Sequence, residues 1–501
     1  MYRNFISGKI CAIVLILAGG YGTRVYAQDV FAGDGTVRLR QLQRAAADYA
    51  EQVLIAEQQN AAAELSLEAY RAGLKPRLDL AANLPNYFRT STEVTQDDGT
   101  IAFREIELNN SSVSLFANQR IAATGGLIGL ETRLQRTDNF AQDTKSYNGS
   151  PVRLTFRQPI LAFNPWKWDR RLLPLQLQVS DAALRAARAD AALDATALFF
   201  DLVSADQERR IAETNREANE ILFDIATERY ELGQINRGDL VQLELELTSA
   251  EQNLLRADRL VGAASAAILR YLGQEYDSQL LEPEAPAAPQ PLRDLEIAAT
   301  RALELLGNRP ELLQLQQRVL EAEREADRIR RDYGPRLDFN ASIGLIRNAD
   351  ELEPIYRDPL DERVVSLTFA IPLLDWGERS ALNRRAQTEV ELARRLGERL
   401  DNELEGRLTQ LLDQWSTVRE ELQLATRIRD LAEERFRISQ ESYTLGAIPL
   451  TDLTFAQQNR DLNTRAYAET LRAYWLTYAG LERLTLWDFV NDQPLYEGLN
   501  E

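Results

Sequence analysis

The chain of 501 residues contains no histidine, one cysteine (Cys11) and one methionine (Met1). Beyond its first residues it therefore offers no imidazole, thiol or thioether group. These absences exclude histidine acid–base catalysis, cysteine nucleophiles and metal sites built from histidine or cysteine. Paired carboxylates could still serve a carbohydrate-active enzyme, but among 77 acidic residues no pair stands out. We expect no enzyme, no cofactor and no bound metal.

Basic residues are too few to form a face for nucleic acid. The 58 lysines and arginines are outnumbered by 77 aspartates and glutamates, which leaves a net charge of -19. A surface that binds phosphates needs an excess of positive charge. We therefore expect no nucleic-acid partner, and we interpret most of the acidic surplus as the solvated faces of long helices.

Long apolar runs are absent after the N-terminus. Residues 10–20 are apolar, follow Arg3 and Lys9, and precede the small-residue cleavage site Val25-Tyr26-Ala27. This run is too short for a spanning helix, which needs roughly 20 apolar residues. The pattern predicts a signal peptide at 1–27. No later segment has 18 successive apolar residues, so a role in the membrane would require a closed barrel of strands.

One block of sequence occurs twice, 213 positions apart. Its first copy is Tyr230, Leu232, Gly233, Ile235, Asp239 and Leu240, and its second is Tyr443, Leu445, Gly446, Ile448, Asp452 and Leu453. Each copy interrupts a long stretch of good helix formers, which predicts two helical hairpins at 169–273 and 377–484. The glycines suit helix C-caps and the aspartates suit the caps of the returning helices. Capping by itself would account for the block.

Alternating apolar and polar residues predict strands in both copies. Outgoing strands at 77–90 and 335–347 share the sequence Arg-Leu-Asp at an offset of 259, and returning strands at 151–159 and 363–373 match at an offset of 213. The difference of 46 residues is an insert in the first copy. We interpret it as an extra hairpin with strands at 112–122 and 126–136 around Gly125-Gly126.

The chain must return to its helical side after each set of strands, so each copy needs an even number of crossings. The first copy would make four and the second two. Three longer polar links, at 90–111, 137–150 and 347–362, would then lie on the far side, as in bacterial barrels.

These patterns divide the chain into five parts. They are a signal peptide (1–27), a first repeat (28–282), a proline-rich linker (283–292), a second repeat (293–487) and a C-terminal tail (488–501). In each repeat a helix precedes the strands and a long hairpin follows them.

One order of elements occurs twice: a helix, a Pro-x-Leu strand, a returning strand with a terminal proline, a long helix, a Tyr-x-Leu-Gly tip and a return helix. This order resembles that of the TolC-like outer-membrane efflux protein family. The segment Asn308-Arg309-Pro310-Glu311-Leu312 also looks like the family pattern. The resemblance covers nearly the whole chain after the signal peptide. It implies an α+β membrane protein, a homotrimer whose strands close one outer-membrane β-barrel and whose helices continue as a coiled-coil tunnel in the periplasm.

The resemblance also implies a function. The chain would be the channel, or exit duct, of a tripartite efflux or type I secretion system, conducting substrates passively to the exterior. Its partners would be a periplasmic adaptor (membrane fusion) protein, an inner-membrane pump and outer-membrane lipid. The alternative is an exported coiled-coil adaptor or scaffold without a pore, but such a protein should have one hairpin between two halves of a small β domain.

In the family the helical tips dock the adaptor and form the periplasmic gate. The resemblance therefore assigns docking to Leu232, Gly233, Ile235, Leu445, Gly446 and Ile448, and the gate to Asp239, Asp452 and Tyr443. The family's arginine two positions beyond the second tip glycine is replaced by Ile448. The closed state is thus expected to rest on other contacts.

The inserted hairpin leaves the width of the barrel open. Six crossings per chain would give 18 strands in a trimer, whereas four would give 12. In the second case residues 112–136 would form a flap outside the wall.

Overall fold

The computed structural model describes residues 35–96, 99–274, 280–286, 302–303, 305–307, 309–445, 447–489 and 493–495. The predicted signal peptide, Gly446, and parts of the predicted linker and tail lie outside the described residues. The chain divides into two compact units, one of Met1–Ala45 with Leu198–Pro286 and one of Ala46–Ala197 with Ala287–Glu501.

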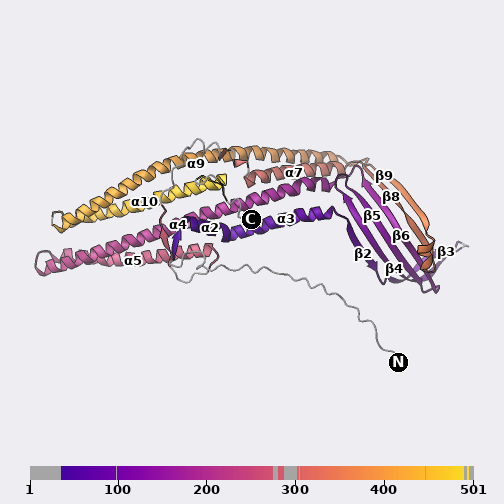
Figure 1. The fold of residues 1–501 in the computed structure, drawn as a ribbon, viewed down its shortest axis with the longest axis horizontal. Helices are drawn as coiled ribbons and strands as arrows, with labels where there is room; N and C mark the ends of the chain where they lie inside the picture. The colour runs from indigo at the N-terminus through magenta and orange to yellow at the C-terminus, as the bar shows by residue number, and fades with distance from the viewer. Residues whose placement is uncertain are drawn as a thin grey trace, which may run out of the picture. The chain divides into compact units, whose positions relative to one another are not determined.

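The first unit contains a helical hairpin, formed by α5 (Arg237–Tyr271) and the part of α4 (Pro165–Glu231) from Leu198 onward. Helix α4 reaches the first tip, and α5 returns beside its second half (Figure 1). The Asn219 amide donates a hydrogen bond to the carbonyl oxygen of Glu246 across this pair, at 3.3 Å. The base of the hairpin is closed by a parallel pairing of β1 (Thr36–Arg38) with β7 (Glu282–Glu284).

The second unit contains the longest helix pair. Helix α9 (Glu378–Thr444) has 67 residues and is therefore about 100 Å long, and α10 (Leu450–Thr485) returns along it. The buried positions of α9 recur at spacings typical of a coiled-coil seam: Ala386, Ala393, Leu404, Leu408, Trp415, Val418, Leu422 and Phe436. At the centre of this seam Trp415 is fully buried, with its ring 4.6 Å from that of Tyr474 and 5.3 Å from that of Tyr478.

Two shorter helices of the second unit, α3 (Glu51–Gly73) and α7 (Pro310–Asp332), lead into strands. In both cases the strand begins a few residues after the helix, at a Pro-Arg-Leu-Asp sequence. Figure 1 shows α3, α7 and α9 meeting the sheet at one of its ends. Helix α2 (Leu39–Tyr49) precedes α3.

Polar contacts tie α7 to the start of α4 and to α9. Arg324 of α7 pairs with Asp169 of α4 at 3.2 Å, and Arg394 of α9 pairs with Glu323 of α7 at 2.8 Å. The indole of Trp168 donates a hydrogen bond to Asp327 at 3.1 Å. These contacts fix the helices where they join the sheet.

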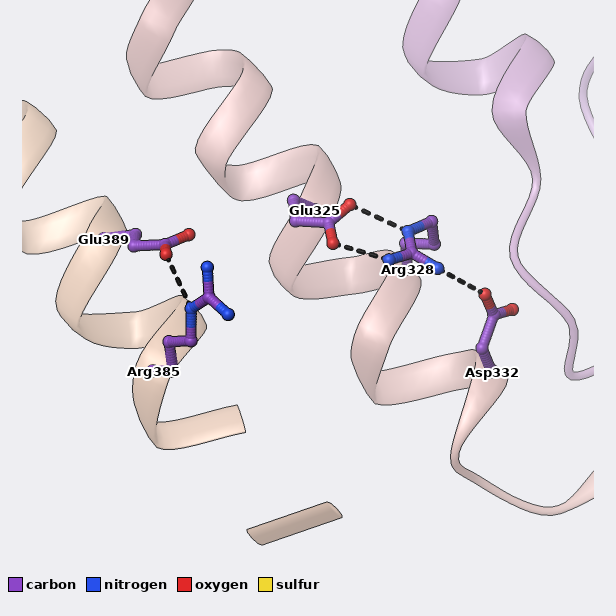
Figure 2. Close-up of polar contacts among 5 residues, drawn as sticks. All are labelled: Glu325, Arg328, Asp332, Arg385 and Glu389. Carbon is purple, nitrogen blue, oxygen red and sulfur yellow. Dashed lines mark hydrogen bonds and ion pairs between the residues drawn. The ribbon is translucent and has the colours of Figure 1, made fainter. Parts of the chain in front are cut away.

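Further ion pairs lie within α7 and within α9, as Figure 2 shows. Arg328 donates two hydrogen bonds to Glu325, at 2.6 and 2.8 Å, and one to Asp332, at 3.1 Å. On α9, Arg385 donates to Glu389 at 2.9 Å. The hydrogen bonds from Arg328 lower the pKa of Glu325, and the charge of Arg385 adds to this effect. Because the side chains of the Arg328–Glu325 and Arg385–Glu389 pairs are between 43% and 73% exposed, each of these pairs contributes little to stability.

The sheet of the second unit is antiparallel and has the order β2-β4-β5-β6-β8-β9, with β3 paired to β4 outside this path. Its strands are β2 (Arg77–Asn83), β3 (Tyr87–Thr95), β4 (Ile101–Ile121), β5 (Gly126–Asn139), β6 (Thr144–Pro159), β8 (Arg336–Ala349) and β9 (Leu360–Ala370). The inserted hairpin, β4 with β5, lies within the sheet between β2 and β6. Among the described residues, the structure therefore gives no flap outside the sheet.

The prediction of one continuous outgoing strand at 77–90 is wrong, because the structure has two strands there, β2 and β3. The predicted strand is interrupted at Pro85, which lacks an amide hydrogen and cannot donate to the ladder. The chain resumes as β3, which pairs with residues 101–109 of β4. Residues 90–111, predicted as a polar link, are thus largely a two-stranded extension.

The other two predicted links are also shorter than expected. Strands β5 and β6 are joined by residues 140–143 alone, and the connection after β8 contains helix α8 (Glu353–Arg357). Ile355 of α8 is fully buried against Gly149 of β6, where a Cβ would lie 2.2 Å from its side chain. Among the described residues, no helix is both long enough and apolar enough to span a bilayer.

We predict that Asp327 stabilises the second unit only above acidic pH. Burial alone would raise the pKa of Asp327, but hydrogen bonds from Trp168, Arg331 and Arg330 outweigh burial and lower it below its ordinary 3.8. A carboxylate with a lowered pKa contributes stability above its unfolded pKa and loses it as pH falls through the folded value. Asp327→Asn should therefore cost about 1 to 3 kcal/mol at pH 7 and little at strongly acid pH.

Hydrogen exchange of α7, corrected for intrinsic rates, measures this difference at pH 7 and well below pH 3.8. Glu398→Gln, at an exposed position of α9, is the control and should change exchange at neither pH. An equal cost of Asp327→Asn at both pH values would contradict the assignment.

Candidate functional site

The first hairpin tip is a helix end closed by two backbone hydrogen bonds. Gly233 has φ of +72°, and its amide donates to the carbonyl oxygen of Tyr230 at 2.9 Å. The amide of Gln234 donates to the carbonyl of Arg229 at 2.8 Å. These two bonds define a Schellman motif, in which glycine is favoured because the left-handed conformation strains other residues. Gly233 therefore has a structural role at the tip.

The sequence predicts that Asp239 caps the returning helix α5. In the structure the cap is Asn236. The side-chain oxygen of Asn236 accepts a hydrogen bond from the backbone amide of Asp239 at 3.0 Å. In turn the Asn236 side-chain amide donates to the Asp239 carboxylate at 2.9 Å. This is a reciprocal arrangement like a capping box, with the acid three residues after the cap. Asp239 is exposed in the first turn, where the helix dipole favours a negative charge.

The second tip closes in the same way but is capped differently. The amide of Ala447 donates to the carbonyl oxygen of Ser442 at 2.9 Å, which is the longer bond of a Schellman motif. The N-cap of α10 is Pro449, which makes no side-chain hydrogen bond. Asp452 is exposed in the first turn of α10 and does not act as the cap, which corrects the prediction. Gly446 lies outside the described residues.

Apolar side chains project from both tips. Leu232 is 72% exposed and Leu445 is 84% exposed. Ile235 and Ile448, each three residues further along the chain, are half-buried. Each tip thus presents an exposed leucine beside a partly covered isoleucine, on a backbone that is held by hydrogen bonds.

Tyr443, the third predicted gate residue, is half-buried in the last turn of α9. It shares the second tip with Asp452, while Asp239 belongs to the first tip. Among the described residues, no group of three or more carboxylates is placed to hold a metal ion.

A set of contacts that the sequence does not predict holds the second hairpin together. The Arg429 guanidinium lies 4.2 Å from the ring centroid of Tyr467, and that of Arg435 lies 5.3 Å from the ring of Phe455. In these two contacts the arginine belongs to α9 and the ring to α10. In a third contact the arginine belongs to α10: Arg460 lies 4.2 Å from the ring centroid of Phe436 on α9. Such cation–π contacts are worth about 0.5 to 2 kcal/mol each, depending on burial.

Arg460 also forms a buried ion pair with its neighbour Asp461, at 2.6 Å. Removal of either partner would leave a buried charge, so the pair requires α9 and α10 to stay together. A sequence pattern offers no signal for these contacts, because arginine is common on exposed helix faces.

Each hairpin leaves an apolar stripe exposed. On α9 the stripe consists of Leu424, Ile428, Leu431 and Ile438, at heptad-like spacings of four, three and seven residues. On α5, Val241, Leu245 and Leu255 are exposed on the other hairpin. Apolar stripes with this spacing are typical of helices that pack against further helices.

We predict that Asn236→Ala loosens the first tip alone. Loss of an N-cap costs about 1 kcal/mol, which corresponds to about fivefold faster hydrogen exchange at residues 237–240. The matched control is Gln234→Ala, which removes a side-chain amide at the same tip but leaves the backbone bonds intact. Equal acceleration by both variants would contradict the capping role of Asn236.

Comparison with known proteins places this geometry in a family. The outer membrane efflux protein family matches residues 127–274 and 303–485, which are more than half of the chain and include both helical hairpins. Nodulation protein T of Rhizobium leguminosarum bv. trifolii is 22% identical over 330 residues, covering 63% of this chain and 68% of that protein.

Solved structures share the fold. A membrane protein from Pseudomonas aeruginosa superimposes with a TM-score of 0.64 at 16% identity, covering 92% of each chain. The CmeC outer membrane channel of Campylobacter jejuni superimposes with a TM-score of 0.63 at 15% identity, covering 92% of this chain and 87% of that one. Both similarities extend over strands and helices alike.

The family match decides between the interpretations of the sequence. Its two segments lie within the two predicted repeats, 28–282 and 293–487. Members of the family are channels and not enzymes, and the comparisons give no support to an adaptor without a pore. The chain therefore belongs to the outer membrane efflux protein family and is an efflux channel of the outer membrane with its helical part in the periplasm.

Proposed function

We propose that three copies of this chain form one conduit, that its helical tips dock a periplasmic adaptor, and that the same tips form the gate. The conduit carries solutes passively from an inner-membrane pump to the exterior. The observation that carries this proposal is the pair of exposed leucines, Leu232 and Leu445, on two tips closed by backbone bonds. A rigid projecting leucine is the kind of anchor that a groove on a partner protein can bury.

Trimer formation is supported by the stripes on the hairpins. Members of the family are trimers that work with adaptor and pump proteins. The stripe on α9, Leu424 to Ile438, is exposed in the isolated chain, and so is Val241 to Leu255 on α5. Burial of such stripes between helices of a tunnel would remove apolar surface from water at about 25 cal/mol per Å².

The gate is proposed at the first turns of α5 and α10. Asp239 and Asp452 are exposed there. Threefold symmetry would convert each aspartate into a ring of three carboxylates, which attracts cations and binds multivalent ones competitively. Tyr443, half-buried one turn before the second reversal, is positioned to contribute to the closed state. Ile448 stands where the resemblance expects an arginine, so the closed state would have to rest on other contacts. We propose that cation–π contacts stiffen this hairpin instead, namely those of Arg429, Arg435 and Arg460.

We predict that Asp452→Asn weakens block by multivalent cations. The channel is reconstituted in a planar bilayer and Mg²⁺ is added from the side of the helical tips. Loss of about 1.4 kcal/mol of cation binding would raise the blocking concentration about tenfold. Glu469→Gln, an exposed acid further along α10, is the matched control and should leave the block unchanged. Equal block in Asp452→Asn and the unmodified channel would reject the gate assignment.

We predict that Leu445→Glu breaks adaptor docking while the trimer persists. A buried carboxylate without a partner is costly, so recovery of the adaptor and pump with the channel, purified from its native membrane, should fall at least tenfold. Leu232→Glu tests the other tip in the same way. Leu445→Ile keeps the apolar volume and should retain the partners. Full recovery of partners with both glutamate variants would show that docking does not use the tips.

A further inference from the structure

The sheet of one chain ends in two open edges. Among the described residues, β2 has no second neighbour on one side and β9 has none on the other. Backbone amides and carbonyls at such edges have no water to bind within a bilayer, so the edges must pair with other strands. We infer that β9 of one chain pairs with β2 of the next, so that six strands from each of three chains close an 18-strand wall. This inference rests on the trimer proposed above.

The inserted hairpin is joined to the sheet on both sides. Strand β4 pairs with β2 over seven residue pairs, from Arg77 with Asn118 to Asn83 with Ser112. Strand β5 pairs with β6 over 12 residue pairs. A wall of four strands per chain would require both ladders to be broken and β2 to pair directly with β6.

The hairpin also shares the two faces of the other strands. One row across the sheet, Leu78, Ala117, Leu130, Leu154 and Ile343, is apolar on five successive strands. Four of these five side chains are exposed in the isolated chain, as expected for a surface that meets lipid. The inserted strands contribute two members of this row, so their apolar face is continuous with that of the rest of the sheet.

The adjacent row lies on the opposite, polar face. It runs through Glu131 of β5, Arg153 of β6, Gly344 of β8 and Glu362 of β9. Arg153 reaches across Gly344 to form an ion pair with Glu362 at 2.6 Å. A Cβ at Gly344 would lie 2.6 Å from the carbonyl oxygen of Val152, so glycine permits this close approach. Charged side chains that bridge three strands are suited to a lumen and not to lipid.

The two edges are compatible with each other. All neighbouring strands of the path are antiparallel, and their number is even, so β9 and the β2 of another chain would also run antiparallel. Over Val365, Leu367 and Phe369 the β9 edge carries the same alternation as β2, whereas the start of β9 places the ion pair of Asp361 with Arg363 on this face. Leu80 on β2 and Val365 on β9 are 71% and 73% exposed, and each belongs to the apolar face. A second copy of the chain would therefore join lipid-facing residues to lipid-facing residues.

This wall would be wider than one of 12 strands. Barrel diameter grows roughly in proportion to strand number, so 18 strands give a diameter about 1.5 times larger, in the range where a barrel leaves an aqueous channel. The outer-membrane section would then set no size limit on solutes that have passed the helical tips. The inference thus assigns the restriction on solute size to the periplasmic end.

Cysteine pairs test the strand order, because Cys11 is the only natural cysteine and lies in the predicted signal peptide. Leu80→Cys is combined with Val365→Cys, and in a second variant with Leu367→Cys, and oxidised in native membranes. Closure of β9 on β2 should give disulfides between chains and a covalent trimer on denaturing gels. Leu80→Cys with Leu115→Cys is the positive control, since these residues face each other and should join within one chain.

Leu78→Cys with Leu154→Cys probes the four-strand alternative. These residues are separated by β4 and β5, hence by about 14 Å, beyond the reach of a disulfide. Formation of this disulfide, together with a cryo-electron microscopy map of the unmodified trimer with a 12-strand wall, would overturn the inference and leave the trimeric channel intact. Recovery of a monomer without conductance would overturn the trimer and the inference together. An 18-strand map with disulfides between chains is the expected result.

Discussion

The structure depends on the requirement that every backbone amide and carbonyl in a bilayer be paired within protein. Among the described residues, the sheet of this chain meets that requirement along its interior ladders but not at the outer sides of β2 and β9. The closure inferred above, in which β9 of one copy pairs with β2 of the next, would satisfy both edges. In such a ring, symmetry determines how many copies of each hairpin and each tip the assembly holds.

The duplication provides one scaffold with two different solutions to the same local problem. The first tip reverses direction through a Schellman motif, and the second shares the longer bond of that motif, from Ala447 to Ser442. The first continues through the side-chain cap of Asn236, whereas the second continues through Pro449, which supplies a fixed φ and no side-chain bond. The second hairpin is instead stiffened further along by arginine–aromatic contacts and the buried Arg460–Asp461 pair. The repeats thus share a shape but differ in what keeps each tip rigid.

The sequence predicts the helices better than the strands, for a physical reason. Helices α4 and α5 span 165–271 where the pattern predicts a hairpin at 169–273, since an uninterrupted run of helix formers is a strong local signal. The extension formed by β3 and the first part of β4 is predicted as a link, because apolar and polar residues do not alternate regularly along it. The sequence likewise placed the caps on Asp239 and Asp452, although the side-chain bond belongs to Asn236, because an acid in the first turn is favourable whether or not it caps. Contacts such as Arg435 with Phe455 depend on which helices meet, which spacing alone does not encode.

The charged side chains of the sheet are arranged differently from those of the helical tips. On the polar face of the sheet Arg153 is balanced by Glu362, and Glu131 lies in the same row, so that acids and a base alternate along the wall. Such a mixed lining exerts a weak net field on a passing solute. At the tips, acids stand at the positive ends of helices, with Asp239 in α5 and Asp452 in α10. If the tips form the gate proposed above, selection among charged solutes belongs there, at the acids in the first turns of α5 and α10.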